Sequence, residues 1–175
     1  MKPVVLFIFL IVLCSCGSTY VIHDYDEKQD FSIYKTFNFY PEMNSGLSEL
    51  DQKRLLLVTE SFMQTEGFAR SETPGIYINF TSQITKEASG NTIGVGLGGG
   101  GGGGVNVGIG GNIPIGSNTY LELTMDFVDV TKDELVWQAI VKSKFHQNAS
   151  PNTKTELFHR MIKKSLDKYP PEKKN

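Results

Sequence analysis

Cysteine is almost absent from this sequence, and histidine is rare. The only two cysteines are Cys14 and Cys16, with one residue between them. A disulfide between cysteines this close would be strained, and a redox pair has two intervening residues. A structural zinc site needs four ligands, whereas the three histidines stand singly, at His23, His146 and His159. We therefore expect no metal site, no redox motif and no cofactor.

Excess positive charge and long apolar runs are also lacking. Lys2 is the only charge in residues 1–15, so the rest of the chain keeps 16 of the 17 basic residues and all 19 acidic ones, a net charge of −3. Nucleic-acid-binding domains present a basic patch, so we expect no nucleic acid partner. The apolar run at residues 4–13 is shorter than the roughly 20 residues that span a bilayer. Its position after Met1 and Lys2 is typical of a secretory signal.

A short motif closes this apolar run: Leu13, Cys14, Ser15 and Cys16. It resembles the lipobox of bacterial lipoproteins, in which a Leu, a tolerated residue and a small residue precede the lipidated Cys. The resemblance implies that residues 1–15 are a signal peptide, with residues 13–15 as its recognition motif. It also implies that Cys16 carries diacylglycerol on its sulfur and a further acyl chain, such as palmitate, on its amino group. Several acyl chains, at ~0.8 kcal/mol per buried CH₂, anchor a protein stably. The alternative is an ordinary cleaved signal with an incidental Cys.

The rest of the chain alternates between strand-like and helix-like patterns. Residues 48–66 have helical periodicity, with Ser48 as N-cap and Gly67 after the last turn. Residues 152–168 form a second amphipathic helix, which Pro170 and Pro171 stop. Strands are expected at residues 20–25, 34–40, 76–84, 120–129 and 135–145. We expect an α+β fold, a largely antiparallel sheet with two helices on one face. Its bounds are a tether at 16–19, one domain at 20–171 and a charged tail at 172–175.

The apolar pattern also predicts which side chains are buried. Trp137 is expected in the core, at an inward position of the last hairpin. In the first helix the apolar face is expected to consist of Leu50, Leu57, Val58, Phe62 and Met63. The charged residues of that helix are expected on the opposite side: Asp51, Lys53, Arg54 and Glu60.

Glycine dominates an insertion at residues 91–116. Gly96, Gly98 and Gly101 formally match a dinucleotide-binding fingerprint, but the seven consecutive glycines at 98–104 satisfy any such pattern. No helix follows to bind a phosphate. Apolar residues alternate with others on both sides of the run: Ile93, Val95 and Leu97 before it, and Val105, Val107 and Ile109 after it. This period predicts a Gly-rich hairpin with a glycine tip. A disordered linker is the alternative, and an apolar edge that touches a partner or a membrane is a third.

Several stretches of the chain match one known family. They are Asp30-Phe31-Ser32 with residues 34–37, the helix end near Gly67, the strand at 76–84, the glycine-rich middle, the hairpin at 129–137 and the closing residues 169–171. In this order they resemble the bacterial lipoprotein family described as domain of unknown function 4136. The hairpin turn departs from the family, because residues 132–134 lack its more typical glycine. The resemblance implies a compartment and a fold, and it implies no reaction.

Motifs of catalysis and calcium binding are weak. Asp24, Asp26 and Asp30 resemble half of a calcium loop, but the turn Gly and the final Glu are missing, so we interpret them as a solvated turn. No nucleophile elbow and no zinc-protease motif occurs, and we expect that the protein is not an enzyme.

The sequence therefore favours a lipid-anchored envelope lipoprotein that acts by contact, in an interaction or structural role. The family resemblance and Gly17 after Cys16 favour the outer membrane, with the domain facing the periplasm. The expected partners are the membrane, through the lipid on Cys16, and envelope proteins. Two alternatives remain. One is an envelope hydrolase, and the other is a periplasmic carrier of a small ligand or lipid, which would have an apolar cavity between sheet and helices.

Overall fold

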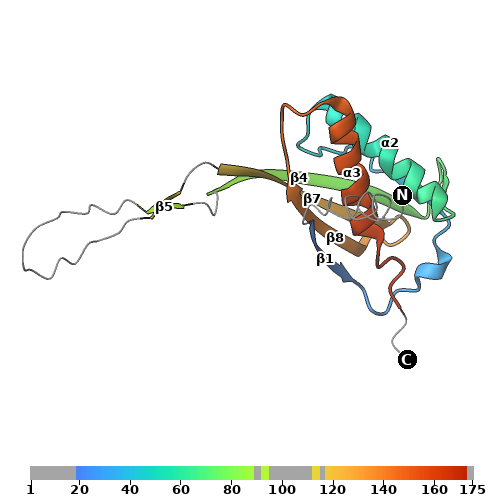
Figure 1. Ribbon diagram of the computed structural model, residues 1–175. Coiled ribbons are helices and arrows are strands. Elements are labelled where there is room, and N and C mark those ends of the chain that lie inside the picture. Colours follow the sequence, from blue (N-terminus) through green and yellow to red (C-terminus); the bar gives the residue numbers. More distant parts are fainter. Residues whose placement is uncertain (1–18, 89–91, 95–111, 115–116, 173–175) are drawn as a thin grey trace, which may run out of the picture.

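A six-stranded mixed sheet with two helices on one of its faces forms the domain (Figure 1). The computed structural model describes residues 19–88, 92–94, 112–114 and 117–172. The sheet strands are β1 (Tyr20–Tyr25), β2 (Thr36–Phe39), β3 (Ala69–Arg70), β4 (Ile76–Ala88), β7 (Ser117–Asp129) and β8 (Glu134–Lys144). The helices are the short 3₁₀ helix η1 (Phe31–Ile33) and the α-helices α2 (Glu49–Thr65) and α3 (Pro151–Leu166). Two short strands, β5 (Thr92–Gly94) and β6 (Asn112–Pro114), form a separate antiparallel pair.

The strand order across the sheet is β1-β8-β7-β4-β2-β3. Neighbours from β1 to β4 are antiparallel, whereas β4–β2 and β2–β3 are parallel. This confirms the α+β fold with a largely antiparallel sheet. The parallel pairs follow from α2, because a parallel pair needs a long crossover connection and α2 lies in the connection between β2 and β4.

The ends of α2 follow the predicted chemistry, and α3 has a serine cap that was not predicted. Ser48 caps α2, since its hydroxyl accepts from the backbone N–H of Asp51 at 3.3 Å. Ser150 caps α3 in the same way through Thr153, with Pro151 in the first turn. Gly67 follows α2 with a φ of +87°, in the left-handed region that glycine adopts without strain. The expected strand at 34–40 is shorter, at Thr36–Phe39, because η1 occupies residues 31–33 and Tyr34 caps that helix.

The core lies between the sheet and the helices. Trp137 is fully buried, which confirms its predicted position. In β7 the buried residues alternate from Leu121 to Asp129, as a sheet with one covered face requires. The helices supply the other half of the core, with Leu55 and Met63 from α2 and, from α3, a larger set: Leu157, Phe158, Met161, Ile162 and Leu166.

The predicted buried face of α2 is partly wrong. Leu50 and Leu57 are 64% and 60% exposed, whereas Asp51 is buried together with Leu55, Thr59 and Met63. These four residues recur every four positions and therefore share one face of a helix. Asp51 is tolerated there because the ammonium of Lys154 lies 2.9 Å and the guanidinium of Arg54 2.7 Å from its carboxylate oxygens.

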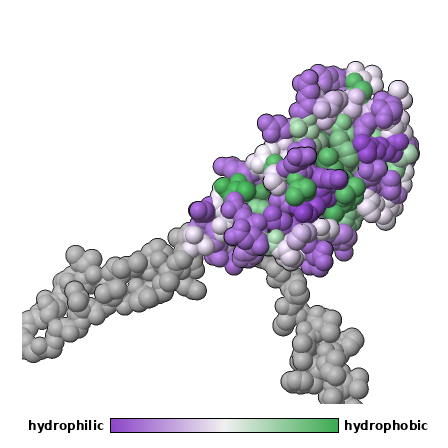
Figure 2. Space-filling model, turned by 90° about the horizontal axis from the view of Figure 1, so that it is seen from above, coloured by the Kyte–Doolittle hydropathy of each residue, from purple (hydrophilic) through white to green (hydrophobic). Residues whose placement is uncertain are grey.

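The surface above the helices is mainly hydrophilic, with smaller hydrophobic areas between the polar side chains (Figure 2). In the part of the chain that the structure describes, no helix is both long and apolar enough to cross a bilayer.

The sheet has two ends that differ in what they carry. At the Tyr20 end, β1 begins, β8 ends, and the longest strand pair, β4 with β7, extends as far as Ala88 and Ser117. At the Tyr25 end, β1 leads into η1, and Tyr25 lies opposite Trp137 in β8. Helix α3 follows β8 and runs back from the Tyr20 end to the Tyr25 end, where His23 Nε2 lies 3.2 Å from the carbonyl oxygens of Lys164 and Ser165.

Candidate functional site

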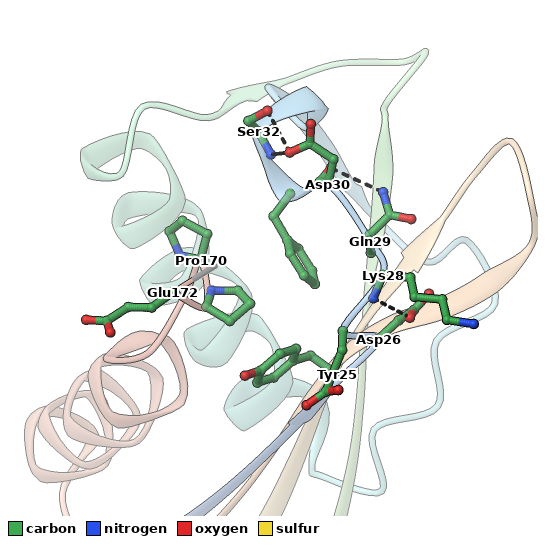
Figure 3. A pocket seen from close by; sticks show the side chains of 11 residues that line it. Tyr25, Asp26, Lys28, Gln29, Asp30, Ser32, Pro170 and Glu172 are labelled. Carbon is green, nitrogen blue, oxygen red and sulfur yellow. Dashed lines mark hydrogen bonds between the residues drawn. The ribbon is translucent and has the colours of Figure 1, made fainter. Parts of the chain in front are cut away.

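A pocket of about 660 Å³ opens at the Tyr25 end of the sheet (Figure 3). One wall is the turn between β1 and η1, and the other is the segment that follows α3. The lining residues are Tyr25, Asp26, Glu27, Lys28, Gln29, Asp30, Phe31, Ser32, Pro170, Pro171 and Glu172. We call this hollow the turn pocket.

Aromatic side chains form the base of the turn pocket. The ring of Tyr25 stacks on Trp137 with a centroid distance of 5.7 Å, and Phe31 meets the edge of Tyr169 at 5.6 Å. Trp137 and Tyr169 are themselves in edge contact at 5.3 Å. Stacked and edge-to-face pairs of this kind add stability beyond area burial. The base is therefore a cluster of packed aromatic rings.

The rim of the turn pocket is acidic. Four of its lining residues are carboxylates, and Lys28 is the single cation among them. Figure 3 shows the side chains of Lys28 and Glu172 extending away from the hollow on opposite sides, so the ammonium and this carboxylate both lie at its outer edge. The rim thus gives the pocket a negative electrostatic character.

Two of the acidic residues also shape the turn. Asp26 Oδ1 accepts from the backbone N–H of Lys28 at 2.9 Å. Asp30 Oδ1 accepts from the backbone N–H and the hydroxyl of Ser32, at 3.1 and 2.8 Å, and so caps η1. Aspartates commonly hold turns by such bonds to backbone groups two residues on. This agrees with the interpretation of Asp26 and Asp30 as turn residues, whereas Asp24 lies in β1, opposite Gln138. The turn also forms one wall of the pocket.

Two buried polar atoms near the base have no hydrogen-bond partner within the described residues. They are Nε1 of Trp137 and the hydroxyl of Tyr169. Burial raises the pKa of Tyr169 well above its usual range, so the hydroxyl stays protonated. The base therefore holds two donors with no acceptor among the described groups.

A smaller hollow of about 270 Å³ adjoins the turn pocket and shares Tyr25 and Asp26 with it. Its other lining residues are Asp24 and residues 135–138 of β8. The aspartate and glutamine side chains extend the polar rim along the β1–β8 edge of the sheet.

The turn between β7 and β8 is held to the segment after η1 by a buried carboxylate. Asp129 Oδ2 accepts from the Tyr34 hydroxyl at 2.5 Å, while Oδ1 accepts from the backbone N–H groups of Thr131 and Lys132 at 2.8 and 2.9 Å. Burial acts to raise the pKa of Asp129, but these hydrogen bonds outweigh it and hold that pKa below its usual range. Asp129 is therefore a buried, charged residue that holds the β7–β8 turn to Tyr34.

The histidines are spread over the domain. His23 packs on Trp137 and contacts the end of α3, His159 lies on α3 beside Phe62, and His146 is exposed. Across the described ranges, no group of three or more His, Cys, Asp or Glu side chains is placed to hold a metal ion.

The predicted lipidation and recognition residues lie outside the described residues. These are Leu13, Cys14, Ser15 and Cys16. Most of the glycine-rich insertion at 91–116 also lies outside them; within it, Ile93 of β5 pairs with Ile113 of β6. The turn pocket was not predicted, because residues 25–32 and 170–172 are far apart in the sequence. The only signals were the aspartates of the turn and the Pro170-Pro171 stop, which local patterns explain equally well.

The fold and the pocket define a small α+β domain with a surface site built from its first turn and its last residues. The chain belongs to the family described as a domain of unknown function, DUF4136, whose model matches residues 21–171.

Solved structures extend the comparison. A PDZ domain protein from Parabacteroides distasonis is similar in fold, with a TM-score of 0.53 and 12% sequence identity. The match covers 95% of this chain and 40% of that one, so this chain spans well under half of its length. PelC, solved as a dodecamer from Paraburkholderia phytofirmans, is aligned over 85% of this chain and 95% of its own, at a TM-score of 0.47 and 11% identity. No curated protein matches this sequence.

Proposed function

We propose that this protein is a lipid-anchored lipoprotein of the bacterial cell envelope that acts by contact with other molecules. The acyl chains on Cys16 hold it in the outer membrane, with the domain on the periplasmic side. Its contact site is the turn pocket.

The direction of β1 is the observation that carries the proposal. β1 begins at Tyr20, four residues after Cys16, and ends at Tyr25 in the wall of the turn pocket. Six residues of strand span roughly 20 Å. An anchor on Cys16 therefore leaves the pocket at the opposite end of the sheet, away from the membrane and open to a partner.

The chemistry of the pocket suits a protein segment that bears both a basic and an apolar side chain. Tyr25 and Phe31 offer aromatic surface at the base, and aromatic rings attract cations as well as apolar groups. The acidic rim is complementary to Lys or Arg, and complementary charge favours encounter and selects partners.

The anchor is tested by metabolic labelling with an alkyne fatty acid. Cys16→Ser is expected to abolish the label and to leave uncleaved precursor or a soluble product. Cys14→Ser is the matched control, because that position tolerates other residues in the lipobox and leaves with the signal. Unchanged labelling of Cys16→Ser would refute the anchor.

The contact site is tested by crosslinking in intact cells followed by pull-down. Glu172→Lys reverses a charge on the pocket rim and is expected to reduce recovery of the partner several-fold. Glu156→Lys makes the same change at an exposed position near the start of α3. Equal recovery with both variants would remove the turn pocket from the proposal.

A small-ligand carrier is the second candidate, with the turn pocket in place of the expected apolar cavity between sheet and helices; the volume of the pocket supports it. Ligand pockets range from about 300 to 1,000 Å³, and this pocket falls within that range. Mass spectrometry of the protein released from membranes under native conditions would detect a bound ligand. Glu172→Lys should then reduce its occupancy.

A further inference from the structure

We propose that the Tyr20 end of the sheet rests on the bilayer surface, with Tyr20, Ile84 and Tyr120 at the level of the lipid headgroups. This inference rests on the proposed anchor at Cys16 and deepens it. It assigns the surface that the anchor brings to the membrane and the orientation of the whole domain.

The length of the tether limits how far this end can be from the bilayer. Four residues separate Cys16 from Tyr20, and a fully extended chain spans at most about 3.6 Å per residue, or roughly 14 Å in total. Tyr20 is opposite Lys142 in β8, which pairs with Glu122 in β7, which in turn pairs with Gln83 in β4. The start of β1 is therefore level with Gln83 across the sheet.

The β4–β7 strand pair reaches beyond that level. From Gln83, β4 continues for five residues to Ala88, still paired with β7 at Ser117. At about 3.4 Å per residue, this two-stranded extension is roughly 17 Å long, which is as long as the tether or longer. When the sheet tilts so that the line from Tyr20 to the end of β4–β7 lies along the bilayer, the start of β1 and the strand pair therefore reach the membrane surface together.

The side chains at this end are those that the membrane interface favours. Tyr20 is 65% and Ile84 40% exposed. The ammonium of Lys142 lies 5.2 Å from the centre of the Tyr120 ring, and Lys86 and Lys144 are exposed nearby. Tyr is enriched at headgroup level, and lysines near the surface are attracted to anionic lipids. The carboxylates of the turn pocket lie at the opposite end.

Few charged residues lie in the part of the strand pair that extends beyond the sheet. After Glu87 in β4, no Asp, Glu, Lys, Arg or His occurs until Glu122 in β7. The paired strand ends, from Ala88 opposite Ser117 to Thr85 opposite Tyr120, contain Lys86 and Glu87 as their only charged residues. Glu87 forms an ion pair with Lys142. Moving this end into the headgroup layer therefore removes few charges from water, and burial of unpaired charges is the main cost of entering a membrane.

The orientation is tested with an environment-sensitive dye at the start of β7 and in the turn that follows β7. Single labels are attached to Ser117→Cys and Thr131→Cys, both at exposed positions, in the full lipidated chain. The protein is reconstituted in vesicles of phosphatidylethanolamine and phosphatidylglycerol that carry a nitroxide lipid. We expect strong quenching at position 117 and little at position 131. Equal quenching at the two positions would overturn the proposal.

A pair of substitutions distinguishes direct contact between the Tyr20 end and the bilayer from simple tethering through Cys16. Tyr20→Glu places a charge at the proposed contact and should weaken quenching at position 117 several-fold. Leu135→Glu is the control, since Leu135 is 52% exposed at the other end of the sheet. If Tyr20→Glu leaves the quenching unchanged, the end is only tethered and does not rest on the bilayer.

The same measurement works without the natural lipid. A chain with Cys16→Ser and a hexahistidine tag in place of residues 1–15 is held on vesicles by a nickel-chelating lipid. Natural lipidation could fail while this chain still shows stronger quenching at position 117 than at position 131, and loses that difference in Tyr20→Glu. That result would support the membrane-contact surface and refute the proposed lipid anchor. If lipidation succeeds and the contrast is absent in both forms, the anchor stands and the surface falls.

Discussion

The hydrogen bond between Tyr34 and Asp129 offers the sharpest test of the fold. Both side chains are 4% exposed, and the Tyr34 hydroxyl donates to Asp129 Oδ2 at 2.5 Å. Tyr34→Phe removes the donor and leaves the aromatic ring in place. One oxygen of a buried, charged carboxylate then loses its partner, which costs about 1.5–3 kcal/mol for a hydrogen bond to a charged group. For a domain of this size, a loss of about 2 kcal/mol lowers the midpoint of thermal unfolding by roughly 4–8 °C.

The effect should depend on pH with a definite sign. The pKa of Asp129 is lowered in the folded protein, so its stabilising contribution is fully present above the unfolded pKa of about 3.9 and is lost as the pH falls through the folded value. Without the Tyr34 donor, the folded pKa moves up. The difference in unfolding free energy between wild type and Tyr34→Phe should therefore be largest near pH 7 and shrink towards pH 3.

Urea unfolding at pH 7, 5 and 3 measures this difference directly. Tyr40→Phe is the matched control. Tyr40 is 39% exposed, so removing its hydroxyl should change the unfolding free energy by less than about 0.5 kcal/mol. A Tyr34→Phe variant as stable as Tyr40→Phe at pH 7 would show that the Tyr34–Asp129 hydrogen bond does not stabilise the fold. A difference that stays constant down to pH 3 would refute the role of the carboxylate charge.

Three further predictions follow from the helices and the glycine segment. Leu55→Ala truncates a buried side chain and should lower the unfolding free energy by about 2–5 kcal/mol. Leu57→Ala, at an exposed position of the same helix, should change it by less than about 0.5 kcal/mol. Equal effects in urea unfolding would contradict the observed buried face of α2. Asp51→Asn should lower stability most near neutral pH. Burial acts to raise the pKa of Asp51, but the bonds from Lys154, Ser48 and Arg54 outweigh burial, so the pKa is below its usual value. The charged carboxylate therefore stabilises the fold at neutral pH, and this contribution is lost as the pH falls through the folded pKa. Shortening the glycines at 98–104 to three should change stability by less than ~1 kcal/mol, since loop-closure entropy varies slowly with length; a larger loss by calorimetry would assign that run a structural role.

The local chemistry of the sequence was a good guide to the elements. Ser48 and Gly67 marked the ends of α2, because caps and left-handed glycines act within one turn of the backbone. Alternating side chains predicted the strand at 120–129, which the structure has as part of β7, since successive residues of a strand point to opposite sides. Family membership could also be inferred from the order of weak motifs along nearly the whole chain.

Other features depended on contacts between distant segments. The buried face of α2 was misjudged because Asp51 looked like a solvent-exposed charge. Its burial depends on Lys154, which approaches from α3, together with Arg54 of the same helix. The parallel placement of β2 beside β4 was likewise invisible to periodicity, which reports the face of a strand but not its neighbour.

The sequence by itself indicated the two α-helices, the main strands, the family and the predicted anchor motif at Cys16, because each depends on residues that are close together in the chain. Only the tertiary structure decided that residues 25–32 meet residues 170–172 in one pocket, and that the start of β1 shares an end of the sheet with the tips of β4 and β7. Both depend on strand register and on the return of α3 across the sheet. These are set by the packing of the whole core, where side chains from every element compete for the same space.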